Sequence, residues 1–350
     1  MSDPVLEALS NSDEDLVVQA TLVSATGSSS KKIGAKMLVG ASGKLLGGVT
    51  IGGCVDAQVI EAGDALIAEG GRRLLDISLD DDEAWEIGLT CGGNVEVLME
   101  RVSPSDQSDP TLSAHVAVRD ALDADRAAVV VTSLDGPRSS LVIDENGTRT
   151  GTLGDTDSDA AAATVATEVF RSGSRTEAVT TPSGERRFFF ERFAPPTTVV
   201  VIGAGQIAMS LTRLARELDM RTIIVDGRER YATRERFPDA DEIHIGMPSE
   251  IVSGIQPGQR TAVVLVAHDY KYELPVLRAL LRSPIGYLGM LGSKKRGVAV
   301  RDLLREEGFT DDELSRIRTP IGLDLGGKSS PEVALSILAE LVAVRSGKRA

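Results

Sequence analysis

Apolar and polar positions along the chain predict an α/β protein whose C-terminal part begins after Ala194-Pro195-Pro196. Beyond that break, short apolar runs predict buried strands, and apolar residues at helical spacing predict helices between them. The expected strands are Thr197–Ile202, Arg221–Val225, Glu242–Ile245, Thr261–Ala267 and Gly286–Met290, and the expected helices are Gly205–Leu218, Glu273–Arg282, Lys294–Glu307 and one that follows Ser329-Ser330-Pro331-Glu332. Such alternation implies a Rossmann-like, doubly wound parallel sheet covered on both faces.

The first 193 residues contain one pattern twice. The spacing that separates Gly48 from Gly151 also separates Gly70 from Gly173. Further matching positions are Leu38-Val39 with Leu141-Val142, and Ala62, Leu66 and Ile67 with Val165, Val169 and Phe170, which form one apolar helix face in each copy. Each copy ends in an extended segment with a Glu-Arg pair, Val95–Val102 and Phe188–Phe193. We therefore predict a duplicated α+β region, with domain limits at 1–103, 104–194 and 195–350.

The candidate chemistry lies where the two copies differ. Gly52-Gly53-Cys54 of the first copy matches Asp155-Thr156-Asp157 of the second, and Thr90-Cys91-Gly92-Gly93 has no counterpart. Both cysteines of the chain belong to these two segments. Features present in only one copy are not required by the shared scaffold, so they are the first candidates for function.

Cys54 precedes an expected helix over about Asp56–Glu69. Free N–H groups at a helix start stabilise anions, so this thiol should have a lowered pKa, and neighbouring glycines let a ligand approach the backbone. A buried cysteine in a tight turn explains the same residues equally well. Two cysteines without a CxxC motif do not make a structural zinc site, which leaves a soft metal, sulfur transfer or a flat ligand as the chemistry of Cys54 and Cys91.

Gly203-Ala204-Gly205-Gln206-Ile207-Ala208 follows an expected strand and opens an expected helix, as in the dinucleotide-binding fingerprint. Asp226 closes the next strand, where an acidic residue can bind a ribose hydroxyl, and this favours a ribose without a 2′-phosphate. His268-Asp269 is expected to end the fourth strand, as a general acid/base or as a simple cap. Ser293 and Lys294 stand at a helix start that suits a phosphate, although a solvated lysine face is the alternative.

Composition narrows the classes of protein that remain. The chain has 38 Lys and Arg against 52 Asp and Glu, a net charge of −14, which disfavours nucleic acid as a partner. We expect neither a signal peptide nor membrane insertion, because the start is acidic and no apolar run is long enough. The expected location is the cytoplasm.

Together these motifs resemble the XdhC–CoxI family, accessory proteins of xanthine dehydrogenase and related molybdenum hydroxylases. The resemblance rests on GGCVDAQVIEAG, GLTCGGNVEVLMER, VVVIGAGQIA, SPIGYLGMLGSKKR and TPIGLDLGGKSSPEVALSILAELVAVR. It implies a chaperone that binds molybdenum cofactor (molybdopterin), protects it while a cysteine desulfurase supplies sulfur, and delivers it to the apo hydroxylase, with homodimerisation as a further expectation. By this resemblance, Gly52, Gly53, Cys54, Cys91, Gly92 and Gly93 would contact the cofactor or sulfur. The family usually has Ser-Gly before Gly-Cys, whereas this chain has Ile51.

Two rival functions remain open from the sequence. One is an NAD-dependent oxidoreductase that uses the fingerprint, with His268 as acid/base and Cys54 in the substrate pocket. The other is a regulatory module that senses NAD or another adenosine dinucleotide through Asp226. An accessory protein is favoured over a hydroxylase, because the chain lacks iron–sulfur cysteines.

Overall fold

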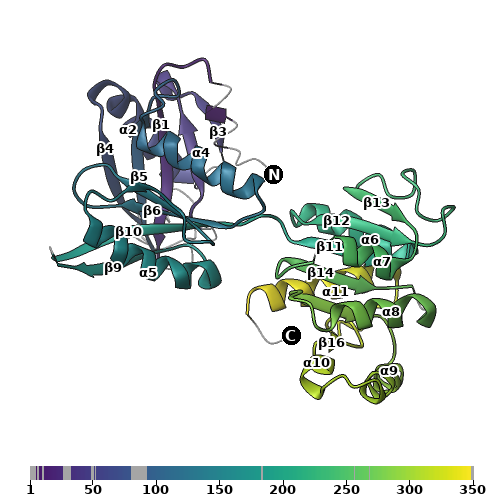
Figure 1. Cartoon of the computed structure of the whole chain (residues 1–350). Coiled ribbons are helices and arrows are strands. Elements are labelled where there is room, and N and C mark those ends of the chain that lie inside the picture. Colours follow the sequence, from purple (N-terminus) through teal and green to yellow (C-terminus); the bar gives the residue numbers. More distant parts are fainter. Residues whose placement is uncertain are drawn as a thin grey trace. The chain divides into compact units, whose positions relative to one another are not determined.

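The structure is a computed structural model that describes residues 5, 8–9, 12–26, 33–48, 51, 53–79, 93–182, 184–255, 257–267 and 269–347. The chain divides into two compact units, Met1–Pro195 and Pro196–Ala350, which are treated separately below (Figure 1). The domain limits predicted from the sequence stay predictions.

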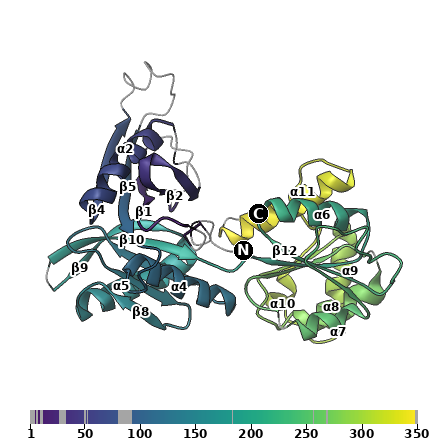
Figure 2. The same ribbon diagram turned by 90° about the horizontal axis from the view of Figure 1, so that it is seen from above.

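The first unit contains two five-stranded antiparallel sheets with the same strand order, β3-β2-β1-β5-β4 and β8-β7-β6-β10-β9. The first sheet and its helices comprise β1 (Val17–Ala25), β2 (Lys36–Val39), the short 3-10 helix η1 (Ala41–Gly43), β3 (Leu45–Gly48), α2 (Gly53–Glu69), β4 (Arg72–Leu79) and β5 (Gly93–Val102). The second follows as α4 (Pro110–Asp123), β6 (Ala128–Ser133), β7 (Ser140–Asp144), β8 (Arg149–Thr152), α5 (Thr156–Ser172), β9 (Arg175–Thr181) and β10 (Gly184–Phe193). Helix α2 packs on the first sheet and α5 on the second (Figure 2).

The glycines that match in the sequence adopt the same backbone conformation in both sheets. Gly48 and Gly151 have φ values of +87° and +85°, and Gly70 and Gly173 have +81° and +91°. A Cβ atom would lie 2.3 Å from the carbonyl oxygen of Lys36 at Gly48, and 2.4 Å from that of Ser140 at Gly151. These positions accept only glycine, because both the dihedral angle and the close backbone exclude a side chain. The two sheets therefore share their turns as well as their strand order.

The helices of the two sheets also begin alike. The Asp56 carboxylate accepts a hydrogen bond from the Ile51 N–H at 2.7 Å, and that of Asp159 accepts one from the Leu153 N–H at 2.6 Å. Ile51 and Leu153 are both buried in the cores under their helices. Ile51, which departs from the family pattern, thus packs under its helix as Leu153 does in the second copy, although it lies five residues before its aspartate and Leu153 lies six before.

The two sheets pack against each other through reciprocal contacts. Leu98 of β5 and Phe189 of β10 meet in one small core. Glu100 of the first sheet pairs with Arg138 before β7, and Glu191 of the second sheet pairs with Lys36 of β2. Each glutamate of the paired Glu-Arg motif therefore points at a cation from the other sheet, as expected for two copies related by an approximate two-fold rotation.

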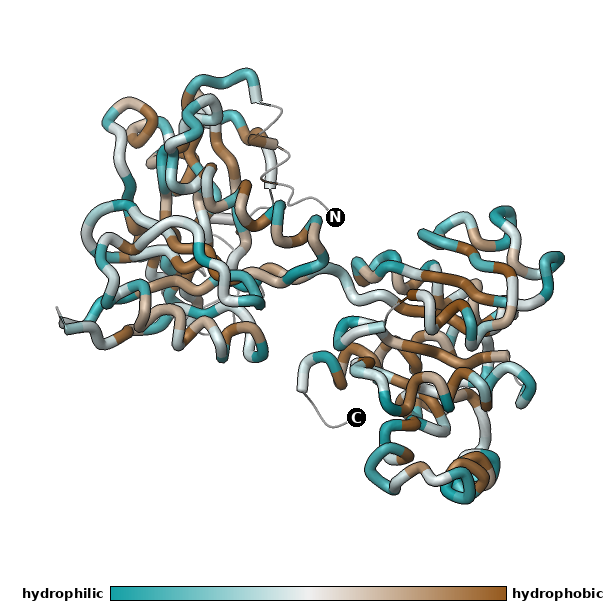
Figure 3. Tube along the Cα trace, viewed as in Figure 1, coloured by the Kyte–Doolittle hydropathy of each residue, from teal (hydrophilic) through white to brown (hydrophobic). Residues whose placement is uncertain are grey.

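The second unit is a six-stranded parallel sheet in the order β13-β12-β11-β14-β15-β16. Its elements are β11 (Thr198–Ile202), α6 (Gln206–Glu217), β12 (Arg221–Asp226), β13 (Glu242–Ile245), α7 (Pro248–Gly254), β14 (Thr261–Leu265), α8 (Tyr270–Leu280), β15 (Tyr287–Met290), α9 (Lys294–Glu306), α10 (Asp311–Ser315), β16 (Ile317–Arg318) and α11 (Ser330–Arg345). Helices α6 and α11 cover one face, α7, α8 and α9 the other, and the apolar strands lie between them (Figure 3). The order reverses between β11 and β14, which confirms the predicted Rossmann-like fold.

Some boundaries differ from the prediction. Helix α2 begins at Gly53 rather than near Asp56, and β14 ends at Leu265 rather than Ala267. The short elements α7, α10 and β16 were not predicted, because segments of two to seven residues have too little periodicity to detect.

Candidate functional site

The glycine-rich turn of the second unit joins β11 to α6. Gly203 has a φ of +108°, and a Cβ atom there would lie 2.7 Å from the Ala267 backbone. No atom of the described residues lies within 4 Å of a Cβ built on Gly205, which caps α6 without a side-chain acceptor from that part of the chain. Ala208 is fully buried against the sheet. The turn thus has the tight bend, open backbone and close helix packing that the fingerprint predicts.

Asp226 ends β12 beside this turn, and its side chain is only 2% exposed. Its Oδ2 accepts hydrogen bonds from the Ala204 N–H at 2.7 Å and from Arg228 Nη2 at 2.9 Å. Its Oδ1 accepts two more from Arg228, from the backbone N–H and from Nε, both at 2.9 Å. Burial alone would raise the pKa of Asp226, but the bonds from Arg228 and Ala204 outweigh it and hold the pKa below its usual value. The carboxylate is therefore ionised and fully hydrogen-bonded.

Arg228 is the partner that the sequence analysis missed. Its guanidinium lies 4.1 Å from the centroid of the Tyr231 ring, and its side chain is 49% exposed. The Asp226 carboxylate raises the pKa of Arg228 further above its usual value. The only signal in the sequence was an arginine two positions after the strand-ending acid.

The remaining candidates of this unit begin helices. Asp269 does not end a strand as expected; it caps α8, accepting a hydrogen bond from the Lys271 N–H at 2.9 Å. His268 lies outside the described residues. Ser293 caps α9 by accepting from the Arg296 N–H at 3.2 Å, and Lys294 is the exposed first residue of that helix. Arg296 also pairs with Glu273, which is completely buried on α8.

The structure describes only part of the two cysteine segments. Gly53 and Cys54 are the first residues of α2, and Gly93 is the first residue of β5, but their side-chain surroundings are not among those described. Gly52, Cys91 and Gly92 lie outside the described residues. Cys54 is therefore the second residue of a 17-residue helix, whereas the sequence analysis placed it just before the helix start.

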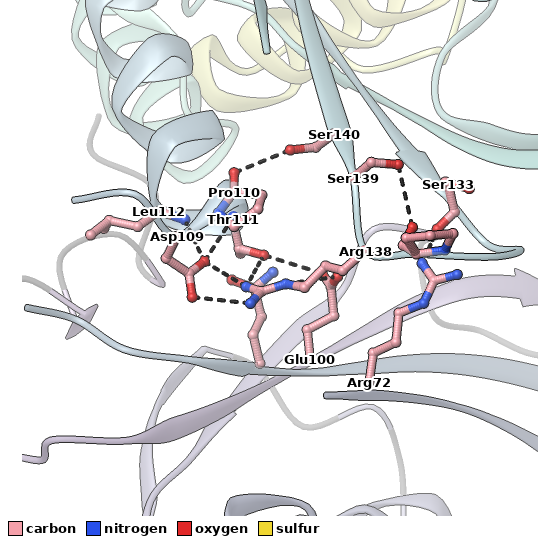
Figure 4. A network of polar contacts seen from close by, with 12 residues as sticks. Arg72, Glu100, Asp109, Pro110, Thr111, Leu112, Ser133, Arg138, Ser139 and Ser140 are labelled. Carbon is pink, nitrogen blue, oxygen red and sulfur yellow. Dashed lines mark hydrogen bonds and ion pairs between the residues drawn. The ribbon is translucent and has the colours of Figure 1, made fainter. Parts of the chain in front are cut away.

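A polar network joins the two sheets of the first unit (Figure 4). Arg138 donates to both oxygens of the Asp109 carboxylate, at 3.0 and 2.5 Å, and lies 3.3 Å from Glu100. Arg72 of β4 donates to the carbonyl oxygens of Ser133 and of Gly136, the latter at 2.7 Å. The cavity beside Arg138 and Glu100 measures only about 30 Å³, which holds one or two waters and no larger ligand.

A wider pocket of about 760 Å³ opens at the start of α5 in the second sheet. It is lined by Arg138, Arg186, Asp155, the turn 150–154 and several serines. Arg186 is already bonded to Asp155 at 3.2 Å and to Ser158 at 2.9 Å. The cations of this pocket are paired within the protein, so it lacks an open charge for an anionic ligand.

Residues 199–341 match the XdhC Rossmann domain, and residues 12–78 match the XdhC and CoxI family. The chain belongs to this family. It is 28% identical to a Bacillus subtilis protein named as a probable subunit of xanthine dehydrogenase, over 99% of this chain and 96% of that one. It is 27% identical to the molybdenum cofactor insertion chaperone PaoD of Escherichia coli, over 94% of this chain and 83% of that one.

A crystal structure described as a xanthine dehydrogenase from Bacillus halodurans resembles this XdhC–CoxI chain with a TM-score of 0.77 and 26% identity, covering 100% of this chain and 97% of that one. No helix among the described residues of the chain is long and apolar enough to cross a membrane. Within that same described part, no group of three or more His, Cys, Asp or Glu is placed to hold a metal ion.

Proposed function

We propose that this chain is a molybdenum cofactor chaperone of the cytoplasm. It holds the cofactor as cargo while a cysteine desulfurase supplies the terminal sulfur, and then delivers it to an apo hydroxylase of the xanthine dehydrogenase type. The observation that carries the proposal is the relationship to an insertion chaperone over nearly the whole chain, combined with family matches in both units.

The difference between the two sheets supports the first one as the cargo site. Helix α5 is capped by Asp155, which accepts a hydrogen bond from the Ser158 N–H at 2.7 Å. Helix α2 is instead preceded by Gly52 and begins with Gly53 and Cys54. A glycine at this position supplies no carboxylate, so we expect the helix start to accept an anionic or soft group of the cargo.

Retention of the cofactor by the full chain tests the proposal. Purified protein is incubated anaerobically with molybdenum cofactor and passed through gel filtration, and the pterin is detected as its fluorescent oxidation product. We expect the pterin to co-elute with the wild type and with Asp157→Ala, the exposed position that matches Cys54 in the second copy. Cys54→Ala and Cys91→Ala should lose it. Failure of the wild type to retain pterin would refute the chaperone, and undiminished retention by the double cysteine variant would remove the thiols from the site.

Gly52→Asp provides a second test that leaves both thiols in place. An aspartate there should cap α2 as Asp155 caps α5, so folding should be unharmed while the carboxylate repels an anionic cargo. We expect lower pterin retention with an unchanged or higher melting temperature. Unchanged retention would show that the start of α2 does not contact the cargo.

The NAD-dependent oxidoreductase alternative receives no support from the ribose-binding position of the Rossmann unit. A dehydrogenase of that type uses the acid at the end of the second strand to bind the ribose diol of NAD. Here the Asp226 carboxylate already accepts four hydrogen bonds from Arg228 and Ala204. The residues present therefore do not fit an unphosphorylated adenosine ribose.

A further inference from the structure

We infer that the glycine-rich edge of the Rossmann unit binds an adenosine nucleotide that carries a 2′-phosphate, and that Arg228 is the residue that selects it. This assigns a ligand class to a site that the proposed cargo function does not use. It also reverses the expectation from the sequence, where Asp226 favoured a ribose without that phosphate.

The Asp226 carboxylate has no hydrogen-bond acceptor position left for a ligand. A carboxylate offers about four lone-pair positions. Those of Asp226 are filled by Ala204 N–H, Arg228 N–H, Arg228 Nε and Arg228 Nη2, at distances between 2.7 and 2.9 Å. A ribose diol would have to displace the arginine from a carboxylate that is 2% exposed. Such a displacement breaks the two-point ion pair between Arg228 and the carboxylate and replaces it by hydrogen bonds from an uncharged diol, which is unfavourable.

The Arg228 side chain is held in place and is still accessible to a ligand. Two of its guanidinium N–H groups, on Nε and Nη2, go to Asp226, and the Tyr231 ring supports the plane at 4.1 Å. No other acceptor among the described residues bonds the rest of the five N–H groups of this guanidinium. With half of the side chain exposed, these groups can bind a phosphate with the paired geometry that guanidinium and phosphate share.

The surroundings of Arg228 favour the binding of an anion. Residues 228–236 contain four arginines and two glutamates, within a chain whose net charge is −14. The α6 N-terminus, capped by Gly205 without a side-chain acceptor, offers free N–H groups for a diphosphate. The Ala204 N–H links this turn directly to the Asp226–Arg228 pair. Both anion positions therefore belong to one connected edge, at the carboxyl ends of the adjacent strands β11 and β12.

Isothermal titration calorimetry of the full chain with small nucleotides tests the inference. The probes are 2′,5′-ADP, its isomer 3′,5′-ADP, and 5′-AMP, followed by NADP⁺ and NAD⁺. We expect 2′,5′-ADP to bind about tenfold or more tighter than 5′-AMP, and NADP⁺ tighter than NAD⁺ by a similar factor, because hydrogen bonds to a charged group contribute this much. Arg228→Ala should reduce both ratios to about one, while Arg213→Ala, at an exposed position in the middle of α6 and outside residues 228–236, should leave them unchanged.

Several outcomes would overturn the inference. Equal affinity for 2′,5′-ADP and 5′-AMP, or the absence of binding of any probe, removes the 2′-phosphate site. Equal binding of 3′,5′-ADP and 2′,5′-ADP would indicate general charge attraction. If Arg228→Ala does not fold, Arg228→Lys keeps the charge without the fork and should still lose most of the preference; full retention by the lysine variant excludes the paired geometry. Cys54→Ala must leave the nucleotide ratios intact, which separates this result from that of the cargo experiment.

Discussion

The two sheets of the first unit are built on one plan, and their differences include the start of the helix and the last hairpin. They share strand order, positive-φ glycines at Gly48 and Gly151, and an aspartate that ties down the turn before the helix. They differ at the start of the helix, where Gly52-Gly53-Cys54 replaces an aspartate cap, and in the last hairpin. That connection runs from residue 80 to 92 in the first sheet and only from 182 to 183 in the second. The second copy thus shows what the scaffold needs, and the excess in the first copy is where specific chemistry is to be sought.

The reciprocal ion pairs between the sheets give the largest expected effect. Arg138→Met removes the cation that pairs with the buried Glu100 and Asp109 carboxylates, and Lys36→Met removes the one that pairs with Glu191. Removing one partner of a buried pair costs about 3–5 kcal/mol, so both variants should lose stability on that scale. Urea unfolding followed by circular dichroism and by Trp85, the single tryptophan of the chain, measures the loss. Arg149→Met, an exposed position, is the control. A loss near zero in one variant and several kcal/mol in the other would show that the contacts are not equivalent.

Substitution of the matched glycines should give the next largest loss of stability. Gly48→Ala and Gly151→Ala should each cost about 2–4 kcal/mol, because a left-handed dihedral angle and a backbone clash add up. Gly71 and Gly147 have φ values of +86° and +83°, and a Cβ built on either meets no atom of the described residues within 4 Å. Alanine at these two positions should cost only the dihedral part, about 1–2 kcal/mol. Thermal unfolding of the four variants checks the ranking, and a large difference between Gly48→Ala and Gly151→Ala would break the comparison of the sheets.

A smaller effect is expected where the two sheets meet at equivalent residues. Glu96 of β5 and Arg187 of β10 form an ion pair of 2.6 Å, with side chains 18% and 40% exposed. Arg187→Glu places two carboxylates together and should cost about 0.5–1 kcal/mol at low salt. The double variant Glu96→Arg, Arg187→Glu should recover most of the loss. A double-mutant cycle in urea measures the coupling, and absence of recovery would mean that the pair does not position the sheets.

The buried Glu100 should change how the stability of the folded chain varies with pH. Burial raises the pKa of Glu100, and the cations Arg138 and Arg72 only partly oppose it. The folded chain thus holds this proton more tightly than the unfolded chain, so the contribution to stability is present below about pH 4.5 and is lost as the pH rises through the raised pKa. Glu100→Gln cannot ionise and should gain stability relative to the wild type between pH 5 and pH 8. The exposed Glu185→Gln should run parallel to the wild type; a parallel course for Glu100→Gln would contradict the prediction.

The sequence predicted those parts of the fold that depend on local pattern. Strands β11 to β15 followed from apolar runs, and the start of α11 followed from Ser329-Ser330-Pro331-Glu332. In the structure Ser329 and Glu332 form a capping box, and the proline lies in the first turn. The positions of Gly203, Gly205 and Asp226 followed from the spacing of the fingerprint. These signals depend on neighbouring residues, which is why one sequence suffices to read them.

The sequence did not predict contacts that depend on how distant segments pack. The Glu-Arg pair was visible in both extended segments, but not that Glu100 and Glu191 each face a cation of the other sheet. Asp226 was placed correctly, yet the return of Arg228 onto it depends on the turn at Gly227, where a Cβ would lie 2.7 Å from the Tyr272 hydroxyl. For the cysteine segments the assignment to cofactor binding stays a prediction.

The contacts that hold Arg228 in place affect the thermodynamics of ligand binding at this site. An arginine on a free surface gives up about 2 kcal/mol of rotamer freedom when a ligand immobilises it. The Asp226 carboxylate and the Tyr231 ring already hold Arg228, so this ordering takes place during folding rather than on association. A preorganised guanidinium can meet an incoming anion without rearrangement, and the entropic penalty of capture is correspondingly smaller.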